Sequence, residues 1–362
     1  MNEIGVIGGA GAIGRVVVDL FRELGYRPVV SDPMLPDSPS LDALLDRCKL
    51  LYISVFPLEL IPGILDKVAD RPDADQFVIL ENSSVKEIIA PGFAKLAAAG
   101  ASLCATHPMC KADQPWKNQN VMLIPYGANQ EPAEQLALAL YRQAEMKIQY
   151  LGSLAEHDEL MCLLQLVPHL VLRIVSTLFA ELKIDLQLLN SAATANFKLF
   201  YMSLWRVLVQ NPQVSASIIS HLLHQKAGID IYARLIKQLS SVYNQDVEEL
   251  TTLFNGFYEQ TQPSQIYQER MNQQGIVTLE RLANLDRRSV SILTERDEVG
   301  MLRKILHPFE KLNINISAID SHLVDGKLRF DIGYDDPLSA ELLAQLEAAI
   351  AELGHRLVVT VA

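Results

Sequence analysis

The sequence has few cysteines and no long uninterrupted apolar run. Its four cysteines, at positions 48, 104, 110 and 162, never occur in a CxxC spacing, so we expect reduced thiols and neither a disulfide framework nor a zinc site. The longest apolar stretch without a charged residue, 161–172, is shorter than a bilayer-spanning helix requires. Glu3 and Gly5 interrupt the N-terminus, where no signal peptide is visible. We therefore expect a soluble, cytoplasmic protein without a membrane partner.

Positive charge is also scarce. The chain has 31 lysines and arginines against 43 aspartates and glutamates, which gives a net charge of −12 at pH 7. This balance argues against a general nucleic-acid surface, and an anionic substrate would need local positive charge. With 362 residues, of which 49% are hydrophobic, the chain is long enough for two or three globular domains.

Residues 1–152 alternate short apolar runs with amphipathic stretches. The strand-like runs are 3–7, 27–31, 50–55, 77–80, 102–106 and 121–124, and the helical stretches include 12–24 and 58–68. This alternation predicts an α/β Rossmann-type domain, in which helices cover both faces of a mostly parallel sheet.

Residues 153–284 have a different texture. Glycine and proline are rare between 156 and 259, and long helical periodicity predicts an all-α domain. The apolar positions recur too densely for a one-sided surface helix. Either a helical dimer interface or a compact internal core would bury them, and the sequence leaves both open.

Residues 285–362 return to strands. Strand-like segments at 289–294, 314–319, 327–334 and 356–361 alternate with helical segments at 298–312 and 340–353, and an Asp325-Gly326 turn precedes the third strand. This βαββαβ order predicts a ferredoxin-like module of about the smallest size that can hold its own core.

A GxGxxG motif directly follows the first strand. It consists of Gly9, Ala10, Gly11, Ala12, Ile13 and Gly14. Glycine at 9 allows a tight turn, glycine at 11 lets the backbone approach a pyrophosphate, and glycine at 14 permits close helix–strand packing. Asp32 lies about 20 residues on, where a carboxylate accepts from ribose hydroxyls. Because no lysine or arginine lies between 33 and 46, NAD is favoured over NADP; the alternative is a turn that binds no nucleotide.

Polar residues follow two further strands. Ser84 comes after the fourth run and His107 after the fifth, at the edge where such sheets bind ligands. A histidine beside a nicotinamide can accept the proton of a hydroxyl as hydride leaves carbon, although His107 could equally be a hydrogen-bonded loop residue. Ser84 could bind the same hydroxyl or cap a helix beginning near Val85, and Lys86 is interpreted as a solvated helix-start residue.

A row of residues in the helical domain is spaced by four. The row consists of His157, Met161, Gln165 and His169, so its members share one helix face. Buried polar groups need partners, which could be ligand atoms or other core groups. Pro168 should kink or locally open this helix.

Taken together, these motifs resemble the prephenate dehydrogenase family of tyrosine biosynthesis over about residues 1–275. The matching segments are 6–14, Ser84-Val85-Lys86, His107-Pro108-Met109 with Asp113, and Glu156-His157-Asp158 followed by Gln165 and His169. The resemblance implies NAD-dependent oxidative decarboxylation of prephenate to 4-hydroxyphenylpyruvate, in a homodimer formed by the helical domain. It also implies that His107 is the catalytic histidine, that Ser84 binds the substrate hydroxyl, and that His169 binds substrate with support from Gln165.

One position departs from the family pattern. Aligned back from Pro212, the family's carboxylate-binding arginine falls on Lys198, which keeps the charge but loses the two-pronged fit. The substrate could therefore be prephenate or an amino analogue, 4-amino-4-deoxyprephenate or L-arogenate. A non-catalytic NAD-binding regulator and a β-hydroxy-acid dehydrogenase with Lys198 as its catalytic lysine are the other readings.

Residues 287–361 resemble an ACT domain, a small-molecule sensing module of amino-acid pathways. Residues 297–302 match the glycine-bearing turn into its first helix, and 313–316 match the start of its second strand. The resemblance implies an effector site near Gly300 and Asn315 and inhibition by an aromatic amino acid, foremost tyrosine. A dimerising module without a ligand is the alternative.

Overall fold

The computed structural model describes residues 2–243, 245–261, 264–283, 288–294, 298–324, 327–334 and 336–360. The chain divides into two compact units, Met1–Ile184 with Ser203–Phe257, and Asp185–Met202 with Tyr258–Ala362. The predicted division into 1–152, 153–284 and 285–362 stays a prediction, because its second boundary lies outside the described residues. The predicted Asp325-Gly326 turn lies outside them as well.

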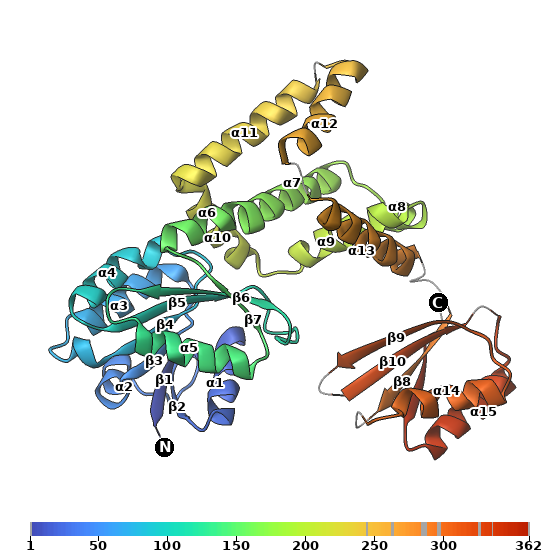
Figure 1. Cartoon of the computed structure of the whole chain (residues 1–362), viewed down its shortest axis with the longest axis horizontal. Helices are drawn as coiled ribbons and strands as arrows, with labels where there is room; N and C mark the ends of the chain where they lie inside the picture. The colour runs from blue at the N-terminus through green and yellow to red at the C-terminus, as the bar shows by residue number, and fades with distance from the viewer. Residues whose placement is uncertain are drawn as a thin grey trace. The chain divides into compact units, whose positions relative to one another are not determined.

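A seven-stranded sheet forms the centre of the first unit (Figure 1). Its strands are β1 (Glu3–Ile7), β2 (Arg27–Ser31), β3 (Leu50–Ile53), β4 (Val78–Glu81), β5 (Ser102–Pro108), β6 (Asn120–Tyr126) and β7 (Lys147–Tyr150). Their order is β2-β1-β3-β4-β5-β6-β7, and every pairing is parallel except that of β5 with β6. The sequence did not predict β7, whose side chains are mostly exposed and therefore carry little apolar signal.

Helices cover both faces of this sheet, as predicted. The helices are α1 (Ala12–Glu23) and α5 (Glu131–Gln143) on one face, and α2 (Leu41–Arg47), α3 (Ile61–Ala69) and α4 (Ala90–Ala98) on the other. Alternation along the strands divides the core between the faces, since Ile4 and Val6 join one cluster and Ile7 joins the other. Burying each side chain of this size stabilises the folded state by about 1.5–3 kcal/mol.

One continuous helix begins the helical part. It consists of α6 (Leu154–Met161), a π-helical turn η4 (Cys162–Leu166) and α7 (Val167–Glu181), and α10 (Pro212–His224) and α11 (Lys226–Tyr243) follow. It begins at Leu154 because the Ser153 hydroxyl accepts from the amide of Glu156 at 3.0 Å. Leu154 and Met161 of this helix and Leu222 of α10 join the core on the α3–α4 face of the sheet, so both helices pack against the sheet.

The same helix is longer and more apolar than the sequence stretch 161–172 suggested. Leu154–Glu181 has 28 residues and a mean hydropathy of 1.7, and it is the one helix in the described part of the chain that could cross a membrane by length and composition. The expectation from the shorter stretch missed it because the helix continues through charged residues on both sides.

The second unit contains a four-stranded antiparallel sheet of order β11-β8-β10-β9. In chain order its elements are β8 (Ser289–Thr294), α14 (Met301–Lys311), β9 (Ile316–Val324), β10 (Lys327–Tyr334), α15 (Ala340–Glu352) and β11 (Arg356–Thr360). This is the predicted βαββαβ order, and Ile292, Ile305, Phe309 and Ile332 lie in its core. The unit also contains α8 (Leu186–Ser191), the start of α9 (Ala195–Leu208), the end of α12 (Val247–Thr261) and α13 (Gln265–Ala283).

Candidate active site

The glycine turn lies between β1 and α1, where the strand order reverses. Gly8, which precedes the motif, adopts the left-handed backbone, with φ at +82°, and the predicted role of Gly9 in the tight turn stays a prediction. A Cβ on Gly8 would lie 2.1 Å from the carbonyl oxygen of Ser54, which follows β3. Gly9 lies against β2 instead, where a Cβ would be 2.7 Å from Val30. The turn is therefore held closely between the ends of neighbouring strands.

The start of α1 is suited to an anion. A Cβ on Gly14 would lie 2.2 Å from the carbonyl oxygen of Gly8, so the helix lies directly against the turn. Gly11 is the N-cap of α1, no side chain caps it, and the first turn carries no acidic residue. The amides of Ala12 and Ile13 belong to the first turn, where N–H groups lack intrahelical acceptors. These groups and the helix dipole favour a phosphate at this point.

Asp32 follows β2 and faces the glycine turn. Its Oδ2 accepts from the amide of Ala10 and its Oδ1 from the amide of Met34, each at 2.9 Å. The Ser38 hydroxyl donates to the Asp32 carbonyl at 2.8 Å. Each carboxylate oxygen retains a further lone pair, so Asp32 can order the turn and still accept from a ribose hydroxyl.

His107 occupies the C-terminal end of β5 and is 4% exposed. Its Nδ1 lies 2.9 Å from Nε2 of His157, and its Nε2 lies 3.4 Å from Nε2 of Gln165. Both partners contact one imidazole, so they share the helix face that their spacing predicts. Because β1, β3, β4 and β5 run parallel, His107 lies at the same edge of the sheet as the glycine turn.

Asp158 joins this helix to two other segments. Its Oδ1 lies 2.8 Å from Nδ1 of His157 and accepts from the amide of Lys86 at 2.8 Å. Its Oδ2 accepts from the amide of Glu87 and from Nε2 of Gln225, each at 2.8 Å. Four donors thus surround a carboxylate that is 2% exposed, which compensates for its burial.

Lys86 is fully buried, so its interpretation as a solvated residue is wrong. Its Nζ donates to Oε2 of Glu81 at 2.7 Å and to the carbonyl of Thr106 at 2.8 Å. Glu81 is fully buried too and requires a cation. The Thr106 hydroxyl continues this network to Tyr141 at 2.7 Å. The pair therefore fixes the strand end that carries His107.

Burial keeps the histidines of this site neutral. Burial lowers the pKa of His107 well below its usual value, and repulsion from His157, when that ring is protonated, and from the charge of Lys86 lowers it further. The pKa of His157 is also lowered by burial, against the opposing effect of Asp158. Although burial acts to raise the pKa of Asp158, hydrogen bonds from His157 and the other donors outweigh it and the net shift is downward. A neutral imidazole is the form that a general base requires.

Ser84 lies in the loop after β4 and is half-buried. The next helical segment is the short turn η3 (Glu87–Ile89), followed by α4 from Ala90. The interpretation of Ser84 as the cap of a helix near Val85 is therefore wrong. Since β4 and β5 are parallel neighbours, Ser84 and His107 lie at one edge of the sheet.

The helix widens where it passes His107. The π-helical turn η4 directly precedes α7, with Pro168 in its first turn, as expected from a residue that lacks an N–H. Oε1 of Gln165 and Nδ1 of His169 are buried without a hydrogen-bond partner. Unpartnered buried polar atoms are costly, so both atoms are available to a ligand.

Positive charge gathers near His169. Burial lowers the pKa of His169, and the charges of Arg173 and Lys111 lower it further. Arg206, on α9, donates from Nη1 and Nη2 to Oε1 of Gln114 at 3.1 and 2.7 Å when that amide is turned to face it. Gln114 lies in the segment that follows β5, which also carries Lys111, so Arg206 contacts this segment of the first unit.

Lys198 belongs to the second unit, whereas His107 belongs to the first. Helix α9 contains two charged residues, Lys198 and Arg206, and Arg206 is the one within the first unit. The predicted role of Lys198 stays a prediction, and Arg206 was not predicted from the sequence. A charge in an otherwise apolar helix was the available signal.

Two features were not predicted from the sequence: the pairing of Glu81 with Lys86, and the contact of His157 with His107, with Asp158 on the other side of His157. A glutamate ending an apolar strand signals a need for a buried cation, and it could have drawn attention to Lys86. The contact between His157 and His107 joins elements far apart in the chain, so no local pattern reveals it.

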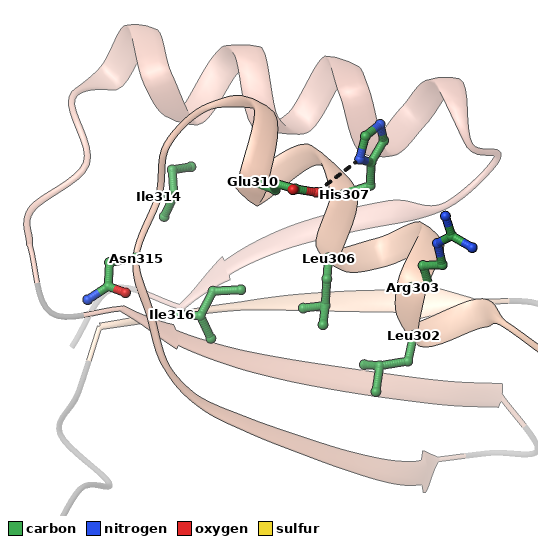
Figure 2. Close-up of a pocket in the computed structure, with 8 residues that line it drawn as sticks. All are labelled: Leu302, Arg303, Leu306, His307, Glu310, Ile314, Asn315 and Ile316. Atoms are coloured by element: carbon green, nitrogen blue, oxygen red, sulfur yellow. Dashed lines mark hydrogen bonds and ion pairs between the residues drawn. The ribbon is translucent and has the colours of Figure 1, made fainter.

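The predicted effector residues lie in the second unit. Gly300 is the N-cap of α14 with φ at +86°, and Asn315 lines an open hollow of about 740 Å³ beside α14 (Figure 2). The other lining residues are Leu302, Arg303, Leu306, His307, Glu310, Ile314 and Ile316. Figure 2 shows His307 beside Glu310, with 3.4 Å between Nδ1 and Oε2.

Known proteins resemble parts of this chain in sequence. Residues 153–256 match the family model described as the prephenate dehydrogenase dimerization domain. The chain is 25% identical over 225 residues to the T-protein of Enterobacter agglomerans, across 60% of this chain and 56% of that protein. The chain thus matches little more than half the length of this curated relative.

Two solved structures share the fold. The prephenate dehydrogenase from A. aeolicus in complex with hydroxyphenyl propionate and NAD+ has a TM-score of 0.57 at 14% identity, over 75% of this chain and 98% of that one. The arogenate dehydrogenase of Synechocystis has a TM-score of 0.51 at 19% identity, over 72% and 99%. These likenesses confirm the Rossmann-like sheet with an all-helical domain. The resemblance to the prephenate dehydrogenase family drawn from the sequence is thereby confirmed for residues 153–256, which match that family's dimerization domain, and for the fold. The resemblance of residues 287–361 to an ACT domain stays a prediction.

Proposed function

We propose that this protein is an NAD-dependent prephenate dehydrogenase. The observation that supports this most strongly is a buried, neutral His107 at the same sheet edge as the glycine turn. A proton acceptor placed beside a nucleotide fold is suited to hydride removal from a carbon that bears a hydroxyl. A non-catalytic nucleotide-binding regulator has no need of such a group.

The first unit has the features that NAD requires. The close approach of Gly14 to the turn, the uncapped start of α1 and the carboxylate of Asp32 fit a pyrophosphate and a ribose. The negative charge of Asp32 would repel a 2′-phosphate. When bound, NAD supplies the hydride acceptor, while the protein orients the substrate and takes up its proton.

The substrate role follows from the groups around His107. Nε2 of His107 would accept the proton of the 4-hydroxyl, with Ser84 at the same sheet edge as a further hydroxyl partner. Oε1 of Gln165 and Nδ1 of His169 would regain the hydrogen bonds that they lack. Prephenate has two carboxylates, and Lys111, Arg173 and Arg206, with Lys198 as predicted, would offset their charge. The ring carboxylate leaves as CO2, and aromatisation of the ring drives the step.

An amino analogue is the second candidate. The unpartnered Oε1 of Gln165 accepts a hydrogen bond, and an amino group can donate one N–H there and another to Nε2 of His107. This observation makes 4-amino-4-deoxyprephenate the second candidate at the ring substituent, after prephenate. L-arogenate differs elsewhere, in the side chain that carries its amino group.

One experiment tests the function directly. Purified protein is supplied with NAD and, in parallel, with prephenate, L-arogenate and 4-amino-4-deoxyprephenate, while NADH formation and CO2 release are followed. We expect the highest kcat/KM with prephenate, and His107→Asn should lower kcat by about 10²-fold or more with NAD binding nearly intact. NADH formation from a β-hydroxy acid without CO2 release would reject the proposal in favour of the other dehydrogenase reading.

We also propose that the protein is a cytoplasmic homodimer. Exposed apolar side chains on α7 include Val171, Ile174 and Leu178, and they fall within the matched dimerization domain. A second copy would cover them, which explains an apolar helix of this length without a membrane. Light scattering at micromolar concentration should give twice the mass of 40.3 kDa.

Regulation by an amino acid is proposed for the ACT-like part of the second unit. In the hollow beside α14, Arg303 offers a partner for a carboxylate and Glu310 one for an ammonium group, while Leu302, Leu306 and Ile316 provide apolar surface. These groups suit an α-amino acid with an apolar or aromatic side chain. We expect tyrosine at millimolar concentration to inhibit the wild type and an Arg303→Ala variant to resist it; activity that stays flat with tyrosine and phenylalanine would reject the proposal.

A further inference from the structure

The proton positions on the three groups behind His107 can be derived from their contacts. Asp158 Oδ1 lies 2.8 Å from Nδ1 of His157, and Nε2 of His157 lies 2.9 Å from Nδ1 of His107. All three side chains are at most 4% exposed, so water does not compete for these bonds. Each gap therefore needs one donor and one acceptor.

The carboxylate of Asp158 determines which atoms donate and which accept in these two hydrogen bonds. Its Oδ1 already accepts from the Lys86 amide, and an ionised carboxylate can only accept. Nδ1 of His157 must then carry the proton and donate to it. Since a neutral imidazole has one N–H, Nε2 of His157 is bare and accepts from Nδ1 of His107.

The same rule leaves Nε2 of His107 without a proton. Its lone pair faces the side-chain amide of Gln165, which donates at 3.4 Å. This contact is long for a hydrogen bond and is easily exchanged for a shorter one. A substrate hydroxyl would thus meet a bare nitrogen.

We propose that Asp158 and His157 are positioning residues that hold His107 in the tautomer with a bare Nε2. The inference rests on the proposed function for its consequence in catalysis, but not for the tautomer itself. In water the neutral imidazole prefers its proton on Nε2, so without these partners His107 would present an N–H to the substrate and could not act as a base. Orientation of a base by a hydrogen bond to its second nitrogen follows the general logic of buried histidines.

The first test reads the tautomer without substrate. Protein with ¹⁵N-labelled histidine rings is examined by NMR at neutral pH, and His107 is assigned among the eight histidines by the signals lost in His107→Asn. We expect a protonated Nδ1 and a bare Nε2. A protonated Nε2 in the wild type overturns the proposal, whether or not the protein acts on prephenate.

Variants then test the consequence for turnover. His157→Leu removes the acceptor for Nδ1 of His107 and should lower kcat by about 10²-fold or more, with KM changed less than threefold. His157→Gln places an amide oxygen near the former Nε2, so we expect it to be at least tenfold faster than His157→Leu. Met161→Leu, one turn further along and fully buried, is the matched packing control.

Two outcomes separate positioning from simple structural support. Adding His157→Leu to His107→Asn should cost no further rate, because the pair acts as a unit. If His157→Leu and His157→Gln are equally slow, or if the two losses multiply, His157 does not act through the His107 tautomer. If no substrate gives NADH while NMR shows the bare Nε2, the proposed function fails and the tautomer assignment stands.

Discussion

The buried pair of Glu81 and Lys86 gives the sharpest prediction on stability. Both side chains are fully buried, and the ammonium group donates to Glu81 at 2.7 Å and to the Thr106 carbonyl at 2.8 Å. Lys86→Met keeps the length of the side chain but leaves a carboxylate and a carbonyl without their donor. Removing one partner of a buried pair costs about 3–5 kcal/mol, a large share of the roughly 5–15 kcal/mol that stabilises an ordinary domain.

The matched control removes the opposite charge as well. In Glu81→Gln/Lys86→Met no buried charge remains, and the amide oxygen can still accept from the Ser83 backbone, which contacts Glu81 in the wild type. We therefore expect the double variant to recover about 2 kcal/mol or more relative to Lys86→Met. Urea unfolding at pH 7, with the m-value checked for constancy, measures each difference.

The same double-mutant cycle has outcomes that would refute this reasoning. Lys86→Met within about 1 kcal/mol of the wild type, or additive effects of the two substitutions, would show that the pair does not act as a buried ion pair.

Three other outcomes follow from the geometry. Gly14→Ala should weaken NAD binding at least tenfold in a fluorescence titration, because its Cβ would lie 2.2 Å from a carbonyl oxygen, whereas Gly63→Ala has no atom within 4 Å and should bind normally. Arg206→Ala should raise KM for the dicarboxylate about tenfold with little change in kcat, and Lys198→Ala should raise it less; the reverse order would favour the original alignment. Since the pKa of folded His107 lies well below the usual value, the unfolded chain takes up its proton first as the pH falls. Unfolding free energy should therefore drop by about 1.4 kcal/mol per pH unit below about pH 6.5 for this residue, and a His107→Gln variant should show a shallower slope in urea titrations at pH 5–7.

Much of the fold could be predicted from periodicity. The strands β1 and β2 and the βαββαβ order of the C-terminal part follow directly from alternation and turn residues. The short β7 could not be found, because its side chains face mostly solvent. The glycine motif was found, but the left-handed residue is Gly8, just before it, which depends on the closeness of Ser54 across the sheet.

The site was only partly predictable, because contacts between segments far apart in the chain decide which groups meet. The spacing of His157 and Gln165 predicts a common face, and the structure shows both against His107. Which partner each polar group finds is a tertiary property, so the spacing could not distinguish a ligand from a core contact. Lys86 illustrates the limit, since its local sequence is that of a surface residue and its burial depends on Glu81.

The four donors around Asp158 come from segments that leave the ribosome at very different times. The amides of Lys86 and Glu87 emerge early, His157 follows, and Gln225 comes last. A growing chain that ends before Gln225 cannot complete this set, so the carboxylate of Asp158 gains its last donor only after all seven strands of the parallel-type sheet have been synthesised.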